Sequence, residues 1–351
     1  MNVIPQTTLA PGFSISKIIK GGWQLSQGHR ASLQSDPVED MIAFAEAGIT
    51  TFDCADIYTG VEELIGKFLK AWRLKHGNLG GIRILTKFVP DYDILETIDK
   101  NYVERIIDRS LRRLGQERLD MVQFSWWNYQ AHRYIETAEW LKELQKAGKI
   151  ELLSGTNFNT QATKEIIDAG ITLSSMQLQY SVLDDRPEQR MAKLCAEKNF
   201  YMLCYGTMAG GFLSSRWLGE KEPLPPFENR SLVKYKLMID TCGGWDWFQS
   251  LLETLDAISK KHQVSISQVA GRFVLDKQHV GGLIIGASSA SHLKENLGLF
   301  GFELDEADRK QIQIHRGKIP MTSGDVFDLE RIKDGPHGSI MRYNLNQLSE
   351  N

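Results

Sequence analysis

Eight short runs of β-forming residues recur along the chain, and most of them are separated by stretches of helical length. The runs lie at 18–20, 49–54, 82–88, 119–124, 150–156, 173–179, 200–205 and 280–286. Apolar residues recur at helical spacing between them, as in 102–115, where Val103, Ile106 and Ile107 share one face. Eight strands that alternate with helices over 351 residues predict an α/β fold, a (β/α)8 TIM barrel, in preference to an open doubly wound sheet.

Two segments break this alternation. Residues 214–246 follow the seventh run and contain prolines and glycine pairs without helical periodicity, and residues 315–351 form a tail rich in Gly, Asp and Ser. Loops of such length commonly cover a functional site. No internal repeat or linker divides the chain, so we expect residues 1–351 to form one barrel domain, with a long loop after the seventh strand and a C-terminal extension over the barrel mouth.

Composition excludes several classes of partner. The 41 Lys and Arg residues nearly balance 44 Asp and Glu residues, so there is no electrostatic reason to expect nucleic acid or an anionic membrane. No apolar run could span a bilayer, and the first residues lack the apolar core of a signal peptide. The 4 cysteines form no CxxC pair and the 8 histidines form no HExxH pair, which argues against a metal site. We therefore expect a cytoplasmic protein that acts on a small molecule; the sequence does not set its oligomeric state.

Polar residues gather where the predicted strands end. The carboxyl ends of barrel strands meet at one mouth, and catalytic groups come from several of them. The residues at these ends are Asp53, Lys87, Ser125, Asn157, Gln177, Tyr205 and Gly286, with Tyr58 on the loop after the second strand. Any one of them is explained by its place at a strand terminus, but the whole set indicates a site.

Asp53, Tyr58 and Lys87 form the sharpest subset. A buried lysine needs a counter-charge, which Asp53 on the neighbouring strand end can supply. A phenol near that ammonium would have its pKa lowered from about 10, because the cation favours the phenolate. Such a tyrosine can give a proton to a developing alkoxide. The alternative is a structural ion pair with Tyr58 merely exposed on its loop.

The stretch AGITTFDCADIYTGVEELIGKFL resembles the signature of the aldo-keto reductase superfamily. The resemblance continues in order through LTKF, LDMVQFSW, GKIELLSGTNFN, MQLQYSVLD, LCYGTMAGGFL and IIGASSASHLKEN, and so covers nearly the whole chain. The family fold is a (β/α)8 barrel that binds a nicotinamide cofactor without a Rossmann fingerprint. This chain likewise has no GxGxxG between a strand and a helix.

The resemblance implies roles for individual residues. Tyr58 would be the general acid, Lys87 the partner that lowers its pKa, and Asp53 the partner of Lys87. Thr156, Asn157 and Gln177 would hold the nicotinamide carboxamide, and Tyr205 would stack on the ring. The remaining cofactor contacts implied are Gly206, Thr207, Met208, Gly210, Gly286, Ser288, His292, Glu295 and Asn296.

The residues at the end of that set, from Ser288 onward, would lie at the adenosine end of the cofactor and decide between NADPH and NADH. Relatives that favour NADPH often place arginine or lysine here to bind the 2′-phosphate. This chain offers Ser288, Ser289 and His292, with Lys294 nearby. We expect NADP(H) on the family resemblance, with NAD(H) as the alternative.

One catalytic position departs from the family pattern. The family usually has a histidine before the tryptophan at the end of the fourth strand, and this chain has Ser125 before Trp126. The serine hydroxyl lies nearer the backbone, which leaves space for water or a bulkier substrate. Trp23 and Trp126 would form an aromatic wall at the mouth, which suggests a flat or apolar substrate, while Trp127 would pack in the core.

Three hypotheses follow. The first is an NAD(P)H-dependent oxidoreductase that reduces an aldehyde or ketone to an alcohol. The second is a cofactor-binding regulatory or sensor protein with little turnover, a class that the missing histidine leaves open. The third is a reductase of an imine or a conjugated double bond.

Overall fold

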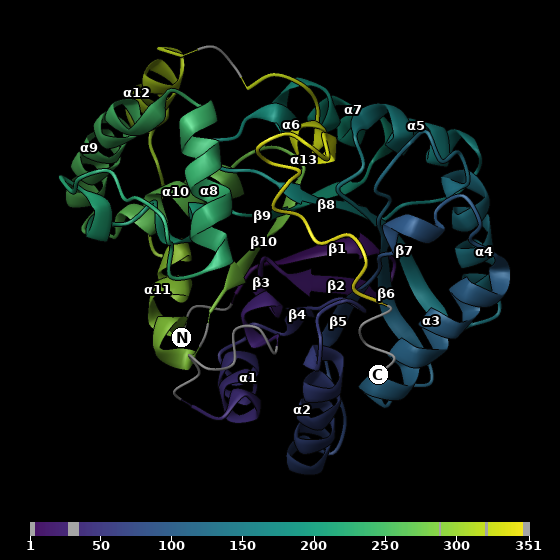
Figure 1. The fold of residues 1–351 in the computed structure, drawn as a ribbon. Helices are drawn as coiled ribbons and strands as arrows, with labels where there is room; N and C mark the ends of the chain where they lie inside the picture. Colours follow the sequence, from purple (N-terminus) through teal and green to yellow (C-terminus); the bar gives the residue numbers. More distant parts are fainter. Residues whose placement is uncertain (1–3, 27–34, 288, 320–321, 347–351) are drawn as a thin grey trace.

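Eight parallel strands close into a barrel, with the helices around its outside (Figure 1). The computed structural model describes residues 4–26, 35–287, 289–319 and 322–346. Around the barrel, each strand pairs with the next one in the chain, and β10 closes the circle on β3. The barrel strands are β3 Ile18–Gly21, β4 Thr51–Asp53, β5 Arg83–Phe88, β6 Leu119–Phe124, β7 Ile150–Thr156, β8 Ser175–Gln179, β9 Tyr201–Tyr205 and β10 Val280–Gly286. Each predicted run overlaps one of these strands, and the predicted (β/α)8 fold is confirmed.

An antiparallel hairpin closes the amino-terminal end of the barrel. It consists of β1 Gln6–Ala10 and β2 Phe13–Ser16. Phe13 and Ile15 of the hairpin pack with Ile19, Leu85 and other apolar side chains that point into the barrel. Because this apolar plug fills one end, the polar strand ends at the other end remain as the mouth.

The helices cover the outside of the barrel, and local signals in the sequence set their ends. Asp36 caps α1 by accepting a hydrogen bond from the backbone N–H of Val38, and Pro37 follows as the first helical residue. Gly115 ends α3 with a φ of 62°, a conformation that favours glycine. The longer helices before the insertion are α1 Pro37–Glu46, α2 Val61–His76, α3 Lys100–Leu114, α4 Tyr134–Lys146, α5 Thr160–Asp168 and α7 Met191–Lys198, with α6 Arg186–Gln189 as a single turn. The later ones are α9 Gly244–His262, α10 Ile266–Leu275, α11 Leu293–Leu297 and α12 Glu306–Arg316.

The insertion differs from its prediction. Residues 214–246, expected to lack helical periodicity, contain the helix α8 Arg230–Thr241. Its buried side chains include Leu232, Tyr235, Met238 and Ile239, which are spaced as one helical face. The prolines and glycines on either side obscured this period in the sequence. The insertion therefore places a helix against the mouth end of β9.

The C-terminal segment runs across the mouth. In Figure 1 the yellow trace passes from α13 Asp328–Arg331, near β8, toward β5 and β6. Near its end, the Asn346 amide donates to Asp56 and to the carbonyl of Val89, beside the ends of β4 and β5. In the part of the chain that the structure describes, no helix is both long and apolar enough to cross a membrane.

Candidate active site

Four buried polar side chains from four strands meet at the centre of the mouth. Asp53 ends β4, Lys87 lies in β5, Gln123 in β6 and Gln177 in β8, and none is more than 5% exposed. Strand register aligns Lys87 with Gln123, so their side chains point to the same side of the sheet. Such a cluster inside an apolar barrel is stable only if its hydrogen bonds are satisfied.

Asp53 is the hub of these hydrogen bonds. Lys87 Nζ donates to Asp53 Oδ2 at 2.7 Å and to the carbonyl of Cys54 at 2.8 Å. The other carboxylate oxygen accepts from Gln123 Nε2 at 2.8 Å and Gln177 Nε2 at 2.6 Å. Three strands therefore hold the Asp53 carboxylate in place, and the carboxylate in turn fixes the lysine.

Tyr58 lies directly beside this ion pair. Lys87 Nζ is 5.0 Å from the centre of the Tyr58 ring, and the Trp23 ring stands edge-on to the tyrosine at 5.1 Å. The structure thus brings together Asp53, Tyr58 and Lys87, which the sequence analysis grouped. The loop that carries Tyr58 begins right after Asp53 and ends at Gly60, whose φ of 77° precedes α2.

The protonation states of Lys87 and Tyr58 follow from burial and from nearby charges together. Burial lowers the pKa of Lys87, but Asp53 and Tyr58 raise it more, so the ammonium keeps its charge. Burial raises the pKa of Tyr58 by more than the nearby Lys87 lowers it. The predicted net lowering of the Tyr58 pKa is therefore wrong, because desolvation of the phenolate outweighs the cation. The phenol is protonated at neutral pH and can act as a proton donor.

The tryptophans after β6 are placed differently from the expectation. Trp126, expected in the substrate wall, is fully buried, and its Nε1 donates to the carbonyls of Asn128 and Ala131. Trp127, expected in the core, is only partly buried and packs edge-on against Tyr343 of the tail. Trp127 Nε1 donates to the carbonyl of Pro90 at 2.9 Å, so the two adjacent side chains have different surroundings. Of the predicted wall, Trp23 alone contacts Tyr58.

Ser125 is buried at the same strand end, and its backbone N–H donates to the carbonyl of Phe88 at 3.0 Å. Close by, Arg331 of α13 donates to the carbonyls of Trp126 and Asn157. The tail therefore ties the ends of β6 and β7 together beside Ser125.

The residues expected around the nicotinamide lie in or directly after β7, β8 and β9. The Tyr205 hydroxyl at the end of β9 donates to Asn157 Oδ1 at 2.8 Å. Asn157 has a φ of 61°, and its N–H donates to the carbonyl of Gln177. The buried Thr156 hydroxyl has no hydrogen-bond partner among the described residues, so it is able to serve a ligand. The amide nitrogen of Gln177 donates to Asp53 and Gln123, which makes Gln177 a support of Asp53 in this structure.

The glycines expected at the diphosphate form a cradle that α8 fills. A Cβ on Gly206 would lie 2.2 Å from the Tyr235 hydroxyl oxygen, and one on Gly210 would lie 2.7 Å from the Tyr235 ring. Both glycines have positive φ, 77° and 63°. Their backbone is therefore open to a close neighbour, which in this structure is Tyr235. Next to them, Thr207 is buried and Met208 is partly buried.

Gly286 at the end of β10 contacts a residue that the sequence analysis did not single out. The Gln24 amide lies where a Cβ on Gly286 would be, 2.2 Å from its nitrogen. Gln24 Oε1 is buried and has no partner among the described residues. An orphaned acceptor beside Gly286 is what a cofactor-binding strand end would present.

The predicted adenosine contacts follow β10 on a short 3₁₀ turn, Ala290–His292, and α11. His292 is more than half exposed and lies 4.0 Å from Glu295. Glu295 also accepts from the Ser265 hydroxyl at 2.7 Å, and Asn296 is buried. Ser288 lies outside the described residues.

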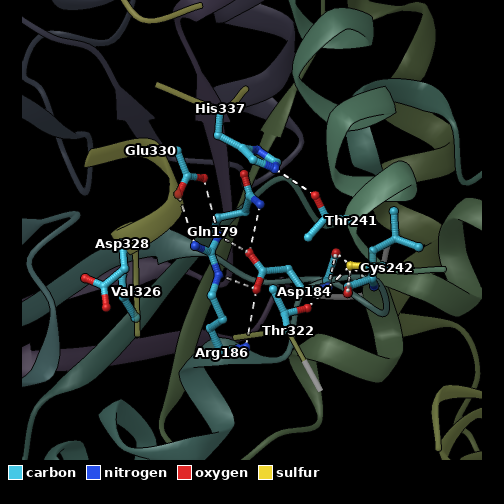
Figure 2. A network of polar contacts seen from close by, with 12 residues as sticks. Gln179, Asp184, Arg186, Thr241, Cys242, Thr322, Val326, Asp328, Glu330 and His337 are labelled. Carbon is cyan, nitrogen blue, oxygen red and sulfur yellow. Dashed lines mark hydrogen bonds and ion pairs between the residues drawn. The ribbon is translucent and has the colours of Figure 1, made fainter. Parts of the chain in front are cut away.

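The tail is anchored by a buried ion cluster that the sequence analysis missed (Figure 2). Arg186 Nη2 lies 2.7 Å from Asp184 Oδ2, and Arg186 Nη1 lies 3.0 Å from Glu330 Oε2. All three side chains are at most 1% exposed. Although burial raises the pKa of Glu330, Arg186 and Lys234 lower it further, to about 2. The tail is thus bound to the loop after β8 by buried charges. Each of these charges is stable there only because an opposite charge lies beside it.

Different signals could have revealed the missed residues. Gln123 sits at an inward position of β6, two residues after buried Met121, so strand alternation could have found it. Tyr235 belongs to the buried face of the helix within the insertion, and Lys234 is its neighbour in the chain. Glu330 has no local signal, because its partner Arg186 is 144 residues away in the chain.

This geometry supports proton donation to a substrate oxygen at the mouth. A neutral phenol beside a fixed ammonium can supply a proton and stabilise the negative charge that forms. In the described part of the chain, no group of three His, Cys, Asp or Glu side chains is arranged to bind a metal ion.

The Asp53–Lys87 pair generates a stability prediction. Lys87→Met should lower the free energy of unfolding by about 3–5 kcal/mol, since it leaves the Asp53 carboxylate buried without a counter-charge. Lys87→Met combined with Asp53→Asn should recover part of that loss, because the stranded charge is removed as well. Urea unfolding of both variants and wild type measures this, and a double variant no more stable than Lys87→Met would contradict it.

Comparison with known proteins places the chain in a family. Over 323 residues it is 27% identical to "Probable aldo-keto reductase 1" of Glycine max, covering 86% of this chain and 85% of that protein. It is 27% identical over 324 residues to a chloroplastic pyridoxal reductase of Arabidopsis thaliana, covering 88% of this chain and 85% of the relative. Its fold is similar to a glycerol dehydrogenase structure from Gluconobacter oxydans, with a TM-score of 0.74 at 19% identity over 93% of this chain and 98% of that one. The family model described as "Aldo/keto reductase family" matches residues 17–316, and the chain therefore belongs to the aldo/keto reductases, a family of oxidoreductases.

Proposed function

We propose that this protein is an NADPH-dependent carbonyl reductase that converts an aldehyde or ketone into an alcohol. The observation that carries this proposal is the phenol of Tyr58 beside the Lys87 ammonium, itself held by Asp53. A protein that only binds a cofactor does not need a buried cation fixed next to a phenol, and burying that cation is costly. The family supports an oxidoreductase, and the site supports an oxidoreductase with a proton donor.

Each residue of the centre has a distinct task in this mechanism. The reduced nicotinamide, when bound, supplies the hydride. Tyr58 donates its proton to the substrate oxygen as negative charge develops there. Lys87 stabilises the phenolate that remains, and Asp53 with its two glutamine donors keeps Lys87 charged and in position. Asn157 and Thr156 would hold the carboxamide, and Tyr205 would lie against the ring.

The mouth favours a flat carbonyl compound as substrate. Ser125 offers a short hydroxyl where the family usually has an imidazole, and Trp23 provides an aromatic surface next to Tyr58. A substrate with a planar ring can fill the space above Ser125 and stack near Trp23. The Arabidopsis relative is named for pyridoxal, an aldehyde on an aromatic ring, which is the same chemical class.

Two other functions are compatible with the same residues. A cofactor-binding sensor with little turnover is consistent with Ser125 in place of the histidine donor. Reduction of an imine or a conjugated double bond would likewise use a hydride and a tyrosine proton. A screen that contains carbonyl, imine and conjugated-alkene substrates separates these functions, because the sensor reduces none of them and the third class reduces only the imines or alkenes.

The role of Tyr58 can be tested by removing its hydroxyl. Tyr58→Phe should reduce kcat by at least about 100-fold, since general acid catalysis contributes on the order of 10²–10⁴. Its affinity for NADPH should remain close to that of wild type, because the phenol faces the substrate. Stopped-flow kinetics and a fluorescence titration measure the two quantities, and equal turnover by both proteins would remove Tyr58 from the mechanism.

Ser125 can be tested by restoring the family residue. Ser125→His should raise kcat/KM for small unhindered aldehydes about tenfold, equivalent to about 1.4 kcal/mol, by adding a donor to the carbonyl oxygen. The same variant should lose activity on bulky aromatic aldehydes, because the imidazole occupies their space. A variant that accelerates all substrates alike would contradict specialisation of the site.

The preference for NADPH is tested at the adenosine end. We expect NADPH to bind more tightly than NADH. His292→Ala or Lys294→Ala should reduce this difference in affinity, while the Kd for NADH changes little. The Glu295 carboxylate lies 4.0 Å from His292 and would repel a phosphate bound to that histidine. Glu295→Gln should therefore increase the difference in affinity between NADPH and NADH. Titration of each variant with both cofactors measures this, and a wild type that prefers NADH would reverse the assignment.

A further inference from the structure

The described part of the tail ends in a buried asparagine. Asn346 is 1% exposed, and both ends of its side-chain amide have partners. The amide oxygen accepts a hydrogen bond from Arg109 of α3, and the backbone N–H donates to Asp91 Oδ1 at 2.8 Å. The amide nitrogen donates to Asp56 Oδ2 at 3.1 Å and to the carbonyl of Val89 at 2.7 Å. A buried amide with partners on both sides is held in one orientation.

The two acceptors of the amide nitrogen belong to the segments that carry the proposed proton donor and its cation. Asp56 lies two residues before Tyr58, and Val89 lies two residues after Lys87. The two segments are also bonded to each other, because the Val89 N–H donates to Asp56 Oδ2 at 3.1 Å. Asn346 therefore bridges the loop after β4 and the loop after β5, close in sequence to both Tyr58 and Lys87.

The chain between Asp56 and Tyr58 is a short turn with its own hydrogen bonds. The Ile57 N–H donates to Asp56 Oδ1 at 3.0 Å, and the Tyr58 N–H donates to the carbonyl of Ala55 at 3.0 Å. Once the Asp56 carboxylate is fixed, this turn leaves the phenol little freedom to move relative to Lys87. The position of the phenol is important, because a misplacement of about 1 Å at a catalytic group can cost about 100-fold in rate.

The charge of Asp56 depends on the same hydrogen bonds. Burial and the Glu62 carboxylate of α2 raise the pKa of Asp56 to about 7. The hydrogen bonds from Val89 and Asn346 act against this rise, as does the Arg109 guanidinium of α3. Removing the Asn346 amide takes one donor from the carboxylate, so its ionised form becomes less favourable. The other titratable side chains that face this site are Tyr102 and Arg113 of α3 and Asp91 of the loop after β5.

We propose that Asn346 is a positioning residue for the reaction at Tyr58: it holds the loop after β4 against the loop after β5 and so fixes the phenol beside the Lys87 ammonium. This inference rests on the proposed function, since it gives Tyr58 the role of proton donor. Asn346 acts through Asp56 and Val89 and does not contact the reacting atoms. A contact across 290 positions of the chain thereby makes the tail part of the catalytic arrangement.

The first variant, Asn346→Leu, removes the amide and keeps a side chain of similar size. Its kcat per bound cofactor should fall at least about tenfold, because a displaced phenol loses part of the roughly 10²–10⁴ that general acid catalysis contributes. Its Kd for NADPH should stay close to that of wild type, because the hydrogen bonds of Asn346 go to none of the residues expected to hold the cofactor. Titration of the tryptophan fluorescence with NADPH gives both the Kd and the number of sites, so a smaller folded fraction cannot be mistaken for slower chemistry.

Hydrogen exchange locates the change without any turnover. The backbone N–H groups of Ile57 and Val89 both donate to the Asp56 carboxylate. In Asn346→Leu these two groups should exchange at least about tenfold faster than in wild type, because the carboxylate that accepts from them is less firmly held. Exchange in β8 should not change. Mass spectrometry of peptic peptides measures both regions.

The second variant, Asn346→Asp, tests the contact with Asp56 itself. It keeps the shape of the side chain, but places a carboxylate oxygen against the acceptors of Asp56 and Val89. The loss of kcat relative to wild type should be large near about pH 8 and smaller near about pH 6, where the two carboxylates share a proton. General damage to the tail would not be relieved by acid. This comparison also decides the question if Asn346→Leu does not fold.

Asn344→Asp is the matched control. Asn344 lies in the same tail and also faces an aspartate, since its amide nitrogen donates to Asp93 Oδ2 at 2.8 Å. Its amide oxygen accepts from the Asp93 N–H at 3.2 Å. This pair is exposed, so water screens the added charge. The kcat and the exchange rates of this variant should stay within about twofold of wild type.

The outcomes separate this inference from the proposed function. Wild-type exchange at Ile57 and Val89 in Asn346→Leu, or an unchanged kcat per bound cofactor, would overturn the role of Asn346 and leave the proposed function standing. An equal loss of kcat in Asn344→Asp and Asn346→Asp would also overturn it, because the effect would then belong to the tail as a whole. A wild type that reduces none of the carbonyl, imine and alkene substrates would overturn the proposed function, and this inference with it.

Discussion

The buried ion pair of Lys87 and Asp53 is the interaction on which the rest of the mouth depends. A lysine only 5% exposed keeps its charge because Asp53 lies 2.7 Å away, and Asp53 keeps its orientation because Gln123 and Gln177 donate to its other oxygen. These four groups come from β4, β5, β6 and β8, so the closed barrel is what makes the cluster possible. Tyr58 then receives a fixed cation beside its ring, which is the arrangement that proton donation requires.

The insertion and the tail complete the site from outside the barrel. Tyr235 of α8 fills the glycine cradle after β9, and Lys234 lies over Tyr205. The tail binds through Glu330 to Arg186 and through Arg331 to the ends of β6 and β7. The insertion and the tail therefore meet each other at Lys234 and Glu330, which lie 4.0 Å apart.

Much of this architecture was predictable from sequence, because barrel strands and helices are local features with their own periods. Asp53, Tyr58 and Lys87 were grouped correctly since strand ends converge at one mouth. Other features depend on contacts between distant residues: Glu330 pairs with Arg186 across 144 positions. The net pKa of Tyr58 depends on the balance between burial and charge, and the different burial of Trp126 and Trp127 depends on the elements that pack around each ring.

The most direct test of the account is to follow one deuterium atom from cofactor to product. Reduced cofactor carrying deuterium at one face of nicotinamide C4 is mixed with the enzyme and an aromatic aldehyde in a single turnover, and the alcohol is analysed by mass spectrometry. We expect deuterium to appear on the carbinol carbon when it is carried on one face of C4 and not when it is carried on the other, because Tyr205 would fix the orientation of the ring. Tight binding of the cofactor, with no deuterium transferred to any carbonyl compound from either face, would contradict the assignment of this protein as a carbonyl reductase.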